Sequence, residues 1–216
     1  MSNSNLLQRL GQASLYVISG DEAPQRQADI LCAAIDGGVA LVQLRNKSAQ
    51  PSDLLAAARR VGDHARANGA IFVVNDHLDL AMEAGADGVH LGQDDLTVAQ
   101  ARDRWAGLIG QSTHSLEQAV SAQEAGADYI GVGPVYETPT KPGRAAVRLG
   151  LLAEVDAAVS LPWFAIGGID SGNIDLVIGA GASRVAVVRA VCHAPDPAGA
   201  ARELLEHLAA PAVSPR

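Results

Sequence analysis

The chain has few aromatic residues, only two cysteines and no long hydrophobic run. Phe, Trp and Tyr make up 3% of its 216 residues, which argues against a surface that stacks nucleic-acid bases. Lys and Arg number 16 against 24 Asp and Glu, for a formal charge of −8. Because an acidic chain without basic runs binds polyanions poorly, we expect no nucleic-acid partner and no membrane partner.

The two cysteines and the apolar content set further limits. Cys32 and Cys192 lack the spacing of a metal site or a disulfide framework, so we expect buried or partly buried reduced thiols. No stretch reaches the ~18 apolar residues of a membrane-spanning helix. Residues Met1–Leu10 lack the basic region and apolar run of a secretory signal. These absences predict a soluble, cytoplasmic protein.

Eight short apolar runs rich in branched residues recur along the chain. Each is bounded by turn signals, which is typical of fully buried parallel strands. The runs are Leu15–Ser19, Leu41–Arg45, Ile71–Asn75, Gly88–Leu91, Leu108–Ser112, Tyr129–Gly133, Trp163–Ile166 and Arg184–Val188.

Ala- and Leu-rich segments of helical character alternate with these runs. They are Pro24–Asp36, Ser52–Asn68, Leu78–Ala84, Thr97–Trp105, Leu116–Ala125, Leu149–Ala158, Asn173–Gly179 and Pro197–Leu208. A weak repeat, Glu-Ala-Gly-Ala-Asp at 83–87 and 124–128, ends two of these segments and leads into the next run. Eight alternating units favour a closed (β/α)₈ barrel, and the length lies near the lower limit of that fold. An open doubly wound sheet is the alternative, but no Gly-x-Gly-x-x-Gly follows the first run.

We therefore predict an α/β fold with a single TIM-barrel domain over residues 1–216. Its core would span about residues 14–208, with a short N-terminal extension and a frayed C-terminal tail.

Polar residues collect where the predicted strands end, and in a barrel these ends share the face that carries enzyme sites. Asp76 and Asp95 follow adjacent strands, and a pair of carboxylates suits Mg²⁺, although either residue could instead cap a helix. Arg45, Lys47 and Lys141 are cations that can hold a multiply charged phosphate group. The sequence thus predicts a metal-assisted diphosphate site near strands two to five.

A second anion site is predicted at the ends of the last strands. Backbone N–H groups around Gly167–Gly168 and Val188–Arg189 match the phosphate site that barrels often place there. The Gly-Gly pair could instead serve backbone geometry alone. A monophosphate is the expected occupant.

Other constellations are missing or weaker. The chain has no Gly-x-x-x-x-Gly-Lys-Ser/Thr loop and no His-x-x-x-His pair, which excludes a P-loop nucleotidase and gives no support for zinc. We expect His90 to be a packed, hydrogen-bonded core histidine. His114, which follows Ser112 and Thr113, is better placed for a role at the mouth of the site.

Eight segments in this order carry a family resemblance: Val42–Lys47, Asn75–Asp76, Gly88–Leu96, Ser112–His114, Gly126–Tyr129, Gly133–Pro134, Thr138–Gly143 and Ala165–Ile169. Over about Ser14 to Leu208 the chain resembles the thiamine phosphate synthase (thiamine-phosphate pyrophosphorylase) family. The resemblance implies a TIM-barrel transferase of a non-methyl alkyl group that acts in thiamine biosynthesis. It would join the diphosphate ester of 4-amino-5-hydroxymethyl-2-methylpyrimidine to 4-methyl-5-(2-phosphoethyl)thiazole, or its 2-carboxylate, giving thiamine phosphate and diphosphate.

The resemblance also implies roles for single residues. Mg²⁺ would be the cofactor, held by Asp76 and Asp95. The implied contacts are Gln43, Leu44, Arg45, Asn46, Lys47 and Asn75 for the pyrimidine diphosphate, Ser112 and Lys141 for the leaving diphosphate, and Thr138, Pro139, Thr140, Gly168, Val188 and Arg189 for the thiazole phosphate. Arg45, Lys47, Ser112 and Lys141 would be catalytic.

The residues themselves favour a dissociative mechanism. The predicted site is rich in cations and hydroxyls and has no obvious nucleophile–base pair, which suits ionisation of a leaving group. Three positions depart from the family pattern: Asn46 replaces a frequent Glu, Arg148 a usual Gly, and Arg189 a common Ser. The first change leaves the neighbouring cations in place, and the last puts a role for that side chain in question.

Three alternatives stay open. A thiazole tautomerase-like barrel shares the thiazole phosphate site; Asp76, Asp95, Lys47 and Lys141 argue against it, and His114 supports it. A sugar-phosphate isomerase on the same fold would need an acid–base pair such as Asp76 with His114. A non-catalytic regulator that binds thiazole phosphate needs no metal site. The sequence leaves open whether the chain forms a homo-oligomer and which thiazole it prefers. Residues 135–147 form a candidate lid.

Overall fold

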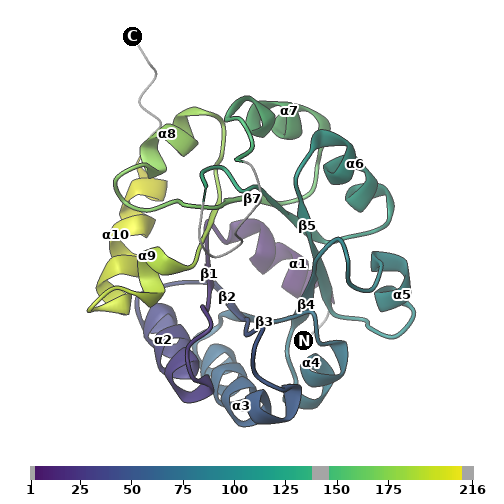
Figure 1. Ribbon diagram of the computed structural model, residues 1–216, viewed down its shortest axis with the longest axis vertical. Coiled ribbons are helices and arrows are strands. Elements are labelled where there is room, and N and C mark those ends of the chain that lie inside the picture. Colours follow the sequence, from purple (N-terminus) through teal and green to yellow (C-terminus); the bar gives the residue numbers. More distant parts are fainter. Residues whose placement is uncertain (1–2, 138–145, 211–216) are drawn as a thin grey trace.

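The computed structural model describes residues 3–137 and 146–210 and contains a closed barrel of eight parallel strands (Figure 1). The strands follow one another in chain order, and β8 pairs with β1 to close the ring. They are β1 Leu15–Ile18, β2 Leu41–Leu44, β3 Ile71–Asn75, β4 Gly88–Leu91, β5 Leu108–Thr113, β6 Tyr129–Val132, β7 Trp163–Ile166 and β8 Val185–Val187. The predicted TIM barrel is confirmed.

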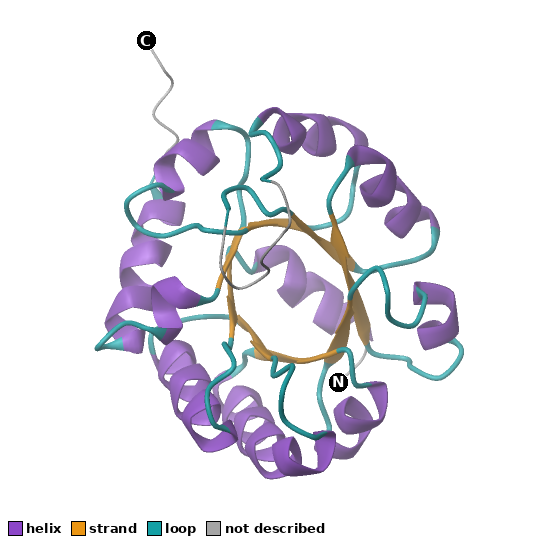
Figure 2. Cartoon of the chain, in the orientation of Figure 1, coloured by secondary structure: helices purple, strands orange, loops and turns teal. Residues whose placement is uncertain are grey.

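Helices surround the barrel (Figure 2). The outer helices are α2 Pro24–Asp36, α3 Pro51–Asn68, α4 Leu78–Ala84, α5 Val98–Arg102, α6 Leu116–Glu124, α7 Gly150–Ala158, α8 Ile174–Gly179, the short α9 Arg189–Cys192 and α10 Pro197–Ala209. Proline opens α2, α3 and α10, where its fixed φ suits the first helical turn. Within the described ranges, no helix is both long and apolar enough to cross a bilayer.

The first helix, α1 (Asn3–Gln12), was not predicted. Leu6 and Leu10 are buried against residues of the barrel interior, including Ile71 and Leu108. The Arg9 guanidinium donates a hydrogen bond to the Gly69 carbonyl oxygen, just before β3 begins. Helix α1 therefore closes the barrel at the end where the strands start, and it is seen through the ring of strands in Figure 2. The opposite end is left for a site.

The core has two layers because side chains alternate along each strand. On β1, Leu15 and Val17 face the helices, whereas Tyr16 and Ile18 face the barrel interior. The interior is apolar where the strands begin and becomes polar toward their ends, where Gln43 and His90 are buried. Both cysteines are buried and free, as expected.

Candidate active site

A cavity of about 330 Å³ opens where the strands end. Its lining draws residues from strands or strand ends around the barrel. The predicted site residues that line it are Gln43, Arg45, Asn75, Ser112, Gly168, Val188 and Arg189. The structure thus brings together residues that span 147 positions in the sequence numbering, from 43 to 189.

Other predicted site residues lie beside the cavity or outside the described ranges. Leu44 is buried in the layer between sheet and helices. The Asn46 amide accepts from the Ala49 N–H within its own loop and donates to the Glu22 carbonyl oxygen in the loop after β1. Thr138, Pro139, Thr140 and Lys141 fall in residues 138–145, outside the described residues, as does most of the candidate lid.

Asp76, Asp95 and Lys47 form a charged cluster beside the cavity. The Lys47 ammonium pairs with the Asp76 carboxylate, and the Asp76 and Asp95 carboxyl groups share a hydrogen bond. Burial, together with the neighbouring Asp95, raises the pKa of Asp76 above its usual value despite the nearby Lys47. Burial acts in the same direction on Asp95, but hydrogen bonds from Asp76 and the Gly92 N–H lower its pKa. The pair therefore holds one proton more readily than two separate aspartates would.

The backbone at Asp76 is unusual. Its φ of 61° lies in the left-handed region, which costs energy for a residue with a Cβ but is tolerated by Asp and Asn. The Asp76 N–H donates to the His90 carbonyl oxygen, 2.9 Å away, and holds the turn at the end of β3. Such strain often accompanies function; here the turn places the carboxylate next to Asp95.

This acid pair fits a divalent cation. Asp76 and Asp95 supply hard oxygen donors from adjacent strand ends, and Asp95 is exposed enough to admit water and phosphate oxygens. Among residues 3–137 and 146–210, no cluster of three or more His, Cys, Asp or Glu could hold a metal. Two carboxylates completed by water and substrate phosphate are the usual environment of Mg²⁺.

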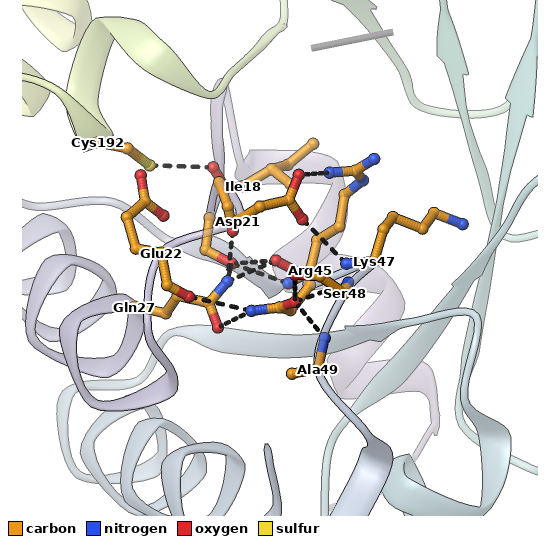
Figure 3. A network of polar contacts seen from close by, with 12 residues as sticks. Ile18, Asp21, Glu22, Gln27, Arg45, Lys47, Ser48, Ala49 and Cys192 are labelled. Carbon is orange, nitrogen blue, oxygen red and sulfur yellow. Dashed lines mark hydrogen bonds and ion pairs between the residues drawn. The ribbon is translucent and has the colours of Figure 1, made fainter. Parts of the chain in front are cut away.

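A buried brace holds Arg45 where β2 ends (Figure 3). The Arg45 N–H donates to Ser19 Oγ at 2.8 Å, and that hydroxyl donates back to the Arg45 carbonyl oxygen at 2.9 Å. Gln27, fully buried on α2, donates to the same carbonyl oxygen at 2.7 Å. Asn46 joins the brace by donating to the Glu22 carbonyl oxygen at 3.0 Å. Hydrogen bonds from side chains thus satisfy the Arg45 backbone N–H and carbonyl oxygen just beyond the end of the strand, and they fix this backbone in place.

The Arg45 guanidinium is prepared for an anion. Its Nη1 lies 3.6 Å from an Asp21 carboxylate oxygen, too long for a hydrogen bond. This buried nitrogen has no hydrogen-bond partner in the described part of the chain. An unsatisfied buried donor is costly, and an anionic ligand in the cavity would relieve that cost.

A network of hydrogen bonds crosses the barrel interior at the bottom of the cavity, from β2 to β5. Gln43 donates its Nε2 hydrogen to the Tyr16 hydroxyl, which lies 3.0 Å from the Tyr129 hydroxyl. The Tyr129 oxygen lies 3.3 Å from His90 Nδ1, and His90 Nε2 lies 3.0 Å from Ser112 Oγ. His90 is therefore packed and hydrogen-bonded as expected, and it also lines the cavity.

The two tyrosines of this hydrogen-bond network were not identified from the sequence. Tyr16 and Tyr129 are fully buried and lie in strands that read as apolar runs. A signal was available: two of only three tyrosines in an aromatic-poor chain stand on strands, and a buried hydroxyl needs a partner.

The other side of the cavity is shaped by Gly167 and Gly168, where φ is 111° and 65°. A Cβ on Gly167 would lie 2.5 Å from Pro134, and one on Gly168 would lie 2.8 Å from Tyr136. Positive φ and the close approach of the β6–α7 loop both require glycine here. The backbone-geometry interpretation of this pair is therefore sound, and Gly168 also lines the cavity.

His114 lies where expected, at the cavity wall. Its Nδ1 contacts the Gly133 carbonyl oxygen, and its backbone N–H donates to Gln118 Oε1 at 2.8 Å. Because a carbonyl oxygen only accepts, Nδ1 carries the hydrogen in this contact.

Comparisons with known proteins identify the family of the chain. A family model described as thiamine monophosphate synthase matches residues 15–191. A thiamine-phosphate synthase of Thermus thermophilus is 54% identical over 178 residues, which cover 81% of this chain and 85% of the relative. One from Gloeobacter violaceus is 46% identical over 209 residues, covering 96% of this chain but 61% of the relative. The chain thus spans about three fifths of that second protein.

Solved structures give the same picture. A thiamine phosphate pyrophosphorylase from Pyrococcus furiosus is similar with a TM-score of 0.85 and 32% identity, over 94% of this chain and 98% of the other. A 3-hexulose-6-phosphate synthase is similar with a TM-score of 0.67 and 22% identity, over 91% and 100%. The second likeness concerns the fold alone.

Proposed function

The chain belongs to the thiamine monophosphate synthase family and is a transferase, and from this premise we propose that it joins two phosphorylated thiamine precursors. One substrate is the diphosphate ester of 4-amino-5-hydroxymethyl-2-methylpyrimidine. The other is 4-methyl-5-(2-phosphoethyl)thiazole or its 2-carboxylate. The products are thiamine phosphate and diphosphate, together with carbon dioxide when the 2-carboxylate is the substrate, and the reaction takes place in the cytoplasm with Mg²⁺.

One observation supports this proposal above the others: the buried Arg45 Nη1 has no hydrogen-bond partner among the described residues, and Lys47 of the Lys47–Asp76–Asp95 cluster stands two positions further along the same strand end. A cavity with an unsatisfied guanidinium on one side and an acid pair beside it suits a ligand that carries a diphosphate. Binding of a monophosphate alone would give no role to Asp76 and Asp95, the two carboxylates proposed to hold Mg²⁺.

The chemical step follows from the charges that line the cavity. The bond between the pyrimidine methylene carbon and the diphosphate oxygen breaks, and the electron pair leaves with the diphosphate. Arg45, Lys47 and Ser112 stabilise the negative charge that develops on the leaving group. Mg²⁺ held by Asp76 and Asp95 would supply further neutralisation of that charge. The thiazole nitrogen then forms the new carbon–nitrogen bond and becomes positively charged.

The thiazole phosphate is assigned to the side of the cavity formed by the ends of β7 and β8. Gly168, Val188 and Arg189 line this side. The Arg189 side chain adds a cation there, which favours a phosphate. Thr138, Pro139 and Thr140 remain predicted contacts of the thiazole phosphate, and Lys141 remains a predicted contact of the leaving diphosphate.

A tautomerase-like reaction is the second candidate, and the position of His114 on the cavity wall favours it. It would need the thiazole phosphate site and a proton-transferring group, but no diphosphate site. The acid pair and Lys47 would then have no role.

The decisive experiment incubates the purified protein with both precursors, with and without Mg²⁺, and identifies the products by mass spectrometry. We expect thiamine phosphate and an equal amount of diphosphate, formed only with the metal. Failure to form product by a folded protein that still binds thiazole phosphate would overturn the synthase proposal in favour of a tautomerase or a regulator.

A further inference from the structure

The hydrogen bonds between Gln43 and Ser112 have a definite direction. The Tyr16 oxygen accepts a hydrogen from Gln43 Nε2. Its own hydrogen is therefore donated to Tyr129, which is the other partner of that oxygen. The Tyr129 hydrogen then goes to His90 Nδ1. A neutral imidazole that accepts at Nδ1 carries its hydrogen on Nε2.

The direction at Ser112 follows from this tautomer. His90 Nε2 donates to Ser112 Oγ across 3.0 Å, so the serine hydrogen is available to the cavity that Ser112 lines. At the other end, Gln43 has committed its amide nitrogen to Tyr16, so its carbonyl oxygen is the atom offered to a ligand. With the Gln43 amide nitrogen facing Tyr16, the opposite direction would turn the Tyr16 hydrogen toward that nitrogen, where two donors would face each other.

We propose that Tyr16, Tyr129 and His90 are positioning residues that fix Gln43 as an acceptor and Ser112 as a donor toward the substrate. The proposal rests on the synthase function, because the aminopyrimidine diphosphate carries the matching groups. Its amino group can donate to the Gln43 oxygen, and its diphosphate oxygens can accept from the Ser112 hydroxyl. A substrate with an acceptor at the first place or a donor at the second would meet an unfavourable contact.

Packing holds the two tyrosines of this hydrogen-bond network in place. The Tyr16 and Tyr129 rings meet edge to face with centroids 5.8 Å apart, and Phe164 packs against both. A Cβ on Gly110 would lie 2.1 Å from the Tyr129 ring, so glycine makes the room through which this side chain crosses the barrel. Burial raises the pKa of both tyrosines, which keeps both hydroxyl hydrogens on the oxygens.

The tautomer of His90 gives a direct test that needs no substrate. Long-range ¹H–¹⁵N correlation spectra of protein labelled in histidine would show the hydrogen on Nε2 of His90, assigned by its loss in His90→Asn. His114 serves as an internal reference with the opposite tautomer, since its Nδ1 contacts the Gly133 carbonyl oxygen. A hydrogen on Nδ1 of His90 in the wild-type protein would overturn the proposal.

Two variants separate this role from mere packing. In Tyr129→Phe the His90 Nδ1 resonance should move, because its donor is gone; in Tyr16→Phe it should move much less. Both variants should raise KM for the pyrimidine diphosphate about tenfold, as for a lost hydrogen bond to a charged or polar group, with KM for the thiazole phosphate unchanged. The control Phe164→Leu disturbs the packing of the same rings. It should leave the His90 tautomer unchanged, as well as the ratio of KM for the pyrimidine diphosphate to KM for the thiazole phosphate.

The outcomes can be told apart from a failure of the synthase proposal. If the wild-type protein forms no thiamine phosphate, the substrate assignment fails. The spectra still decide the direction of the hydrogen bonds between Gln43 and Ser112. An unchanged Nδ1 resonance in Tyr129→Phe, or equal KM changes for both substrates in the two tyrosine variants, would overturn the positioning role.

Discussion

The carboxyl groups of Asp76 and Asp95 share a hydrogen bond although they follow different strands. Two carboxylates meet in this way when a proton or a cation lies between them. The Lys47 ammonium already partners one of them. In the proposed reaction this cluster holds Mg²⁺ through the two carboxylates, and the Lys47 ammonium contacts the bound diphosphate.

Asp95→Asn should lower kcat by roughly 10²-fold while the protein stays folded. The substitution removes one of the two carboxylates proposed to hold Mg²⁺. Weaker binding of the metal in turn weakens the stabilisation of the negatively charged leaving group. Steady-state rates at several Mg²⁺ concentrations measure the effect, with circular dichroism as a check on folding. The neighbouring exposed Asp94 provides a matched control, and Asp94→Asn should change little. Equal rates for wild type and Asp95→Asn would remove Asp95 from the site.

Gln27→Leu should lower kcat/KM by roughly 10–10²-fold, because a small displacement of Arg45 misplaces its guanidinium. The variant also loses the hydrogen bond to the Arg45 carbonyl oxygen, which should lower the free energy of unfolding by about 1–3 kcal/mol. Kinetics and denaturant unfolding test both effects. Gln25→Leu, on the exposed face of the same helix, should change neither; wild-type kinetics in Gln27→Leu would contradict the brace.

The strands could be predicted almost completely from the sequence. Each predicted strand agrees with the structure within one residue at either end, because a parallel strand buried on both faces is written as an apolar run between turn residues. Helix α1 was missed because its burial depends on the distant barrel floor. Leu6 and Leu10 stand one helical turn apart, but two leucines near a terminus indicate little without their partner surface.

The site was predictable where it follows strand alternation and obscure where it depends on register. Gln43 and Arg45 lie two positions apart at one strand end, and both line the cavity as expected. The contact between Tyr16 and Tyr129 joins residues 113 positions apart. Only the closed barrel brings these two hydroxyls together, so no local pattern could reveal them.

The repeated Glu-Ala-Gly-Ala-Asp segments acquire a physical role in the structure. Asp87 and Asp128 each accept a hydrogen bond from the N–H of the preceding strand, at Phe72 (3.0 Å) and Ile109 (2.7 Å). Asp128 also pairs with Arg102 at 2.7 Å. The repeat thus ties the start of one strand to the start of the next.

Asp128→Ala should lower the free energy of unfolding by about 1–3 kcal/mol, because it leaves the buried Ile109 N–H without an acceptor. Since these contacts lie at the end of the barrel opposite the cavity, kcat should not change. Denaturant unfolding and steady-state kinetics test the two statements. The exposed Asp103 offers a control, and Asp103→Ala should cost much less stability. A loss of activity without a loss of stability would contradict this structural role.

Alkaline pH should destabilise the protein through its buried tyrosines. Burial raises the pKa of Tyr16 and Tyr129 above the usual value, so the folded state keeps both neutral while the unfolded state ionises near pH ~10. Their contribution is fully present below that pH. It is lost as the pH rises further, by up to about 1.4 kcal/mol per pH unit for each tyrosine. Free energies of unfolding from pH ~8 to ~11 should therefore fall less steeply in Tyr129→Phe than in the wild type. Parallel curves for the two proteins would show that Tyr129 ionises equally in the folded and unfolded states, contrary to its burial between Tyr16 and Phe164.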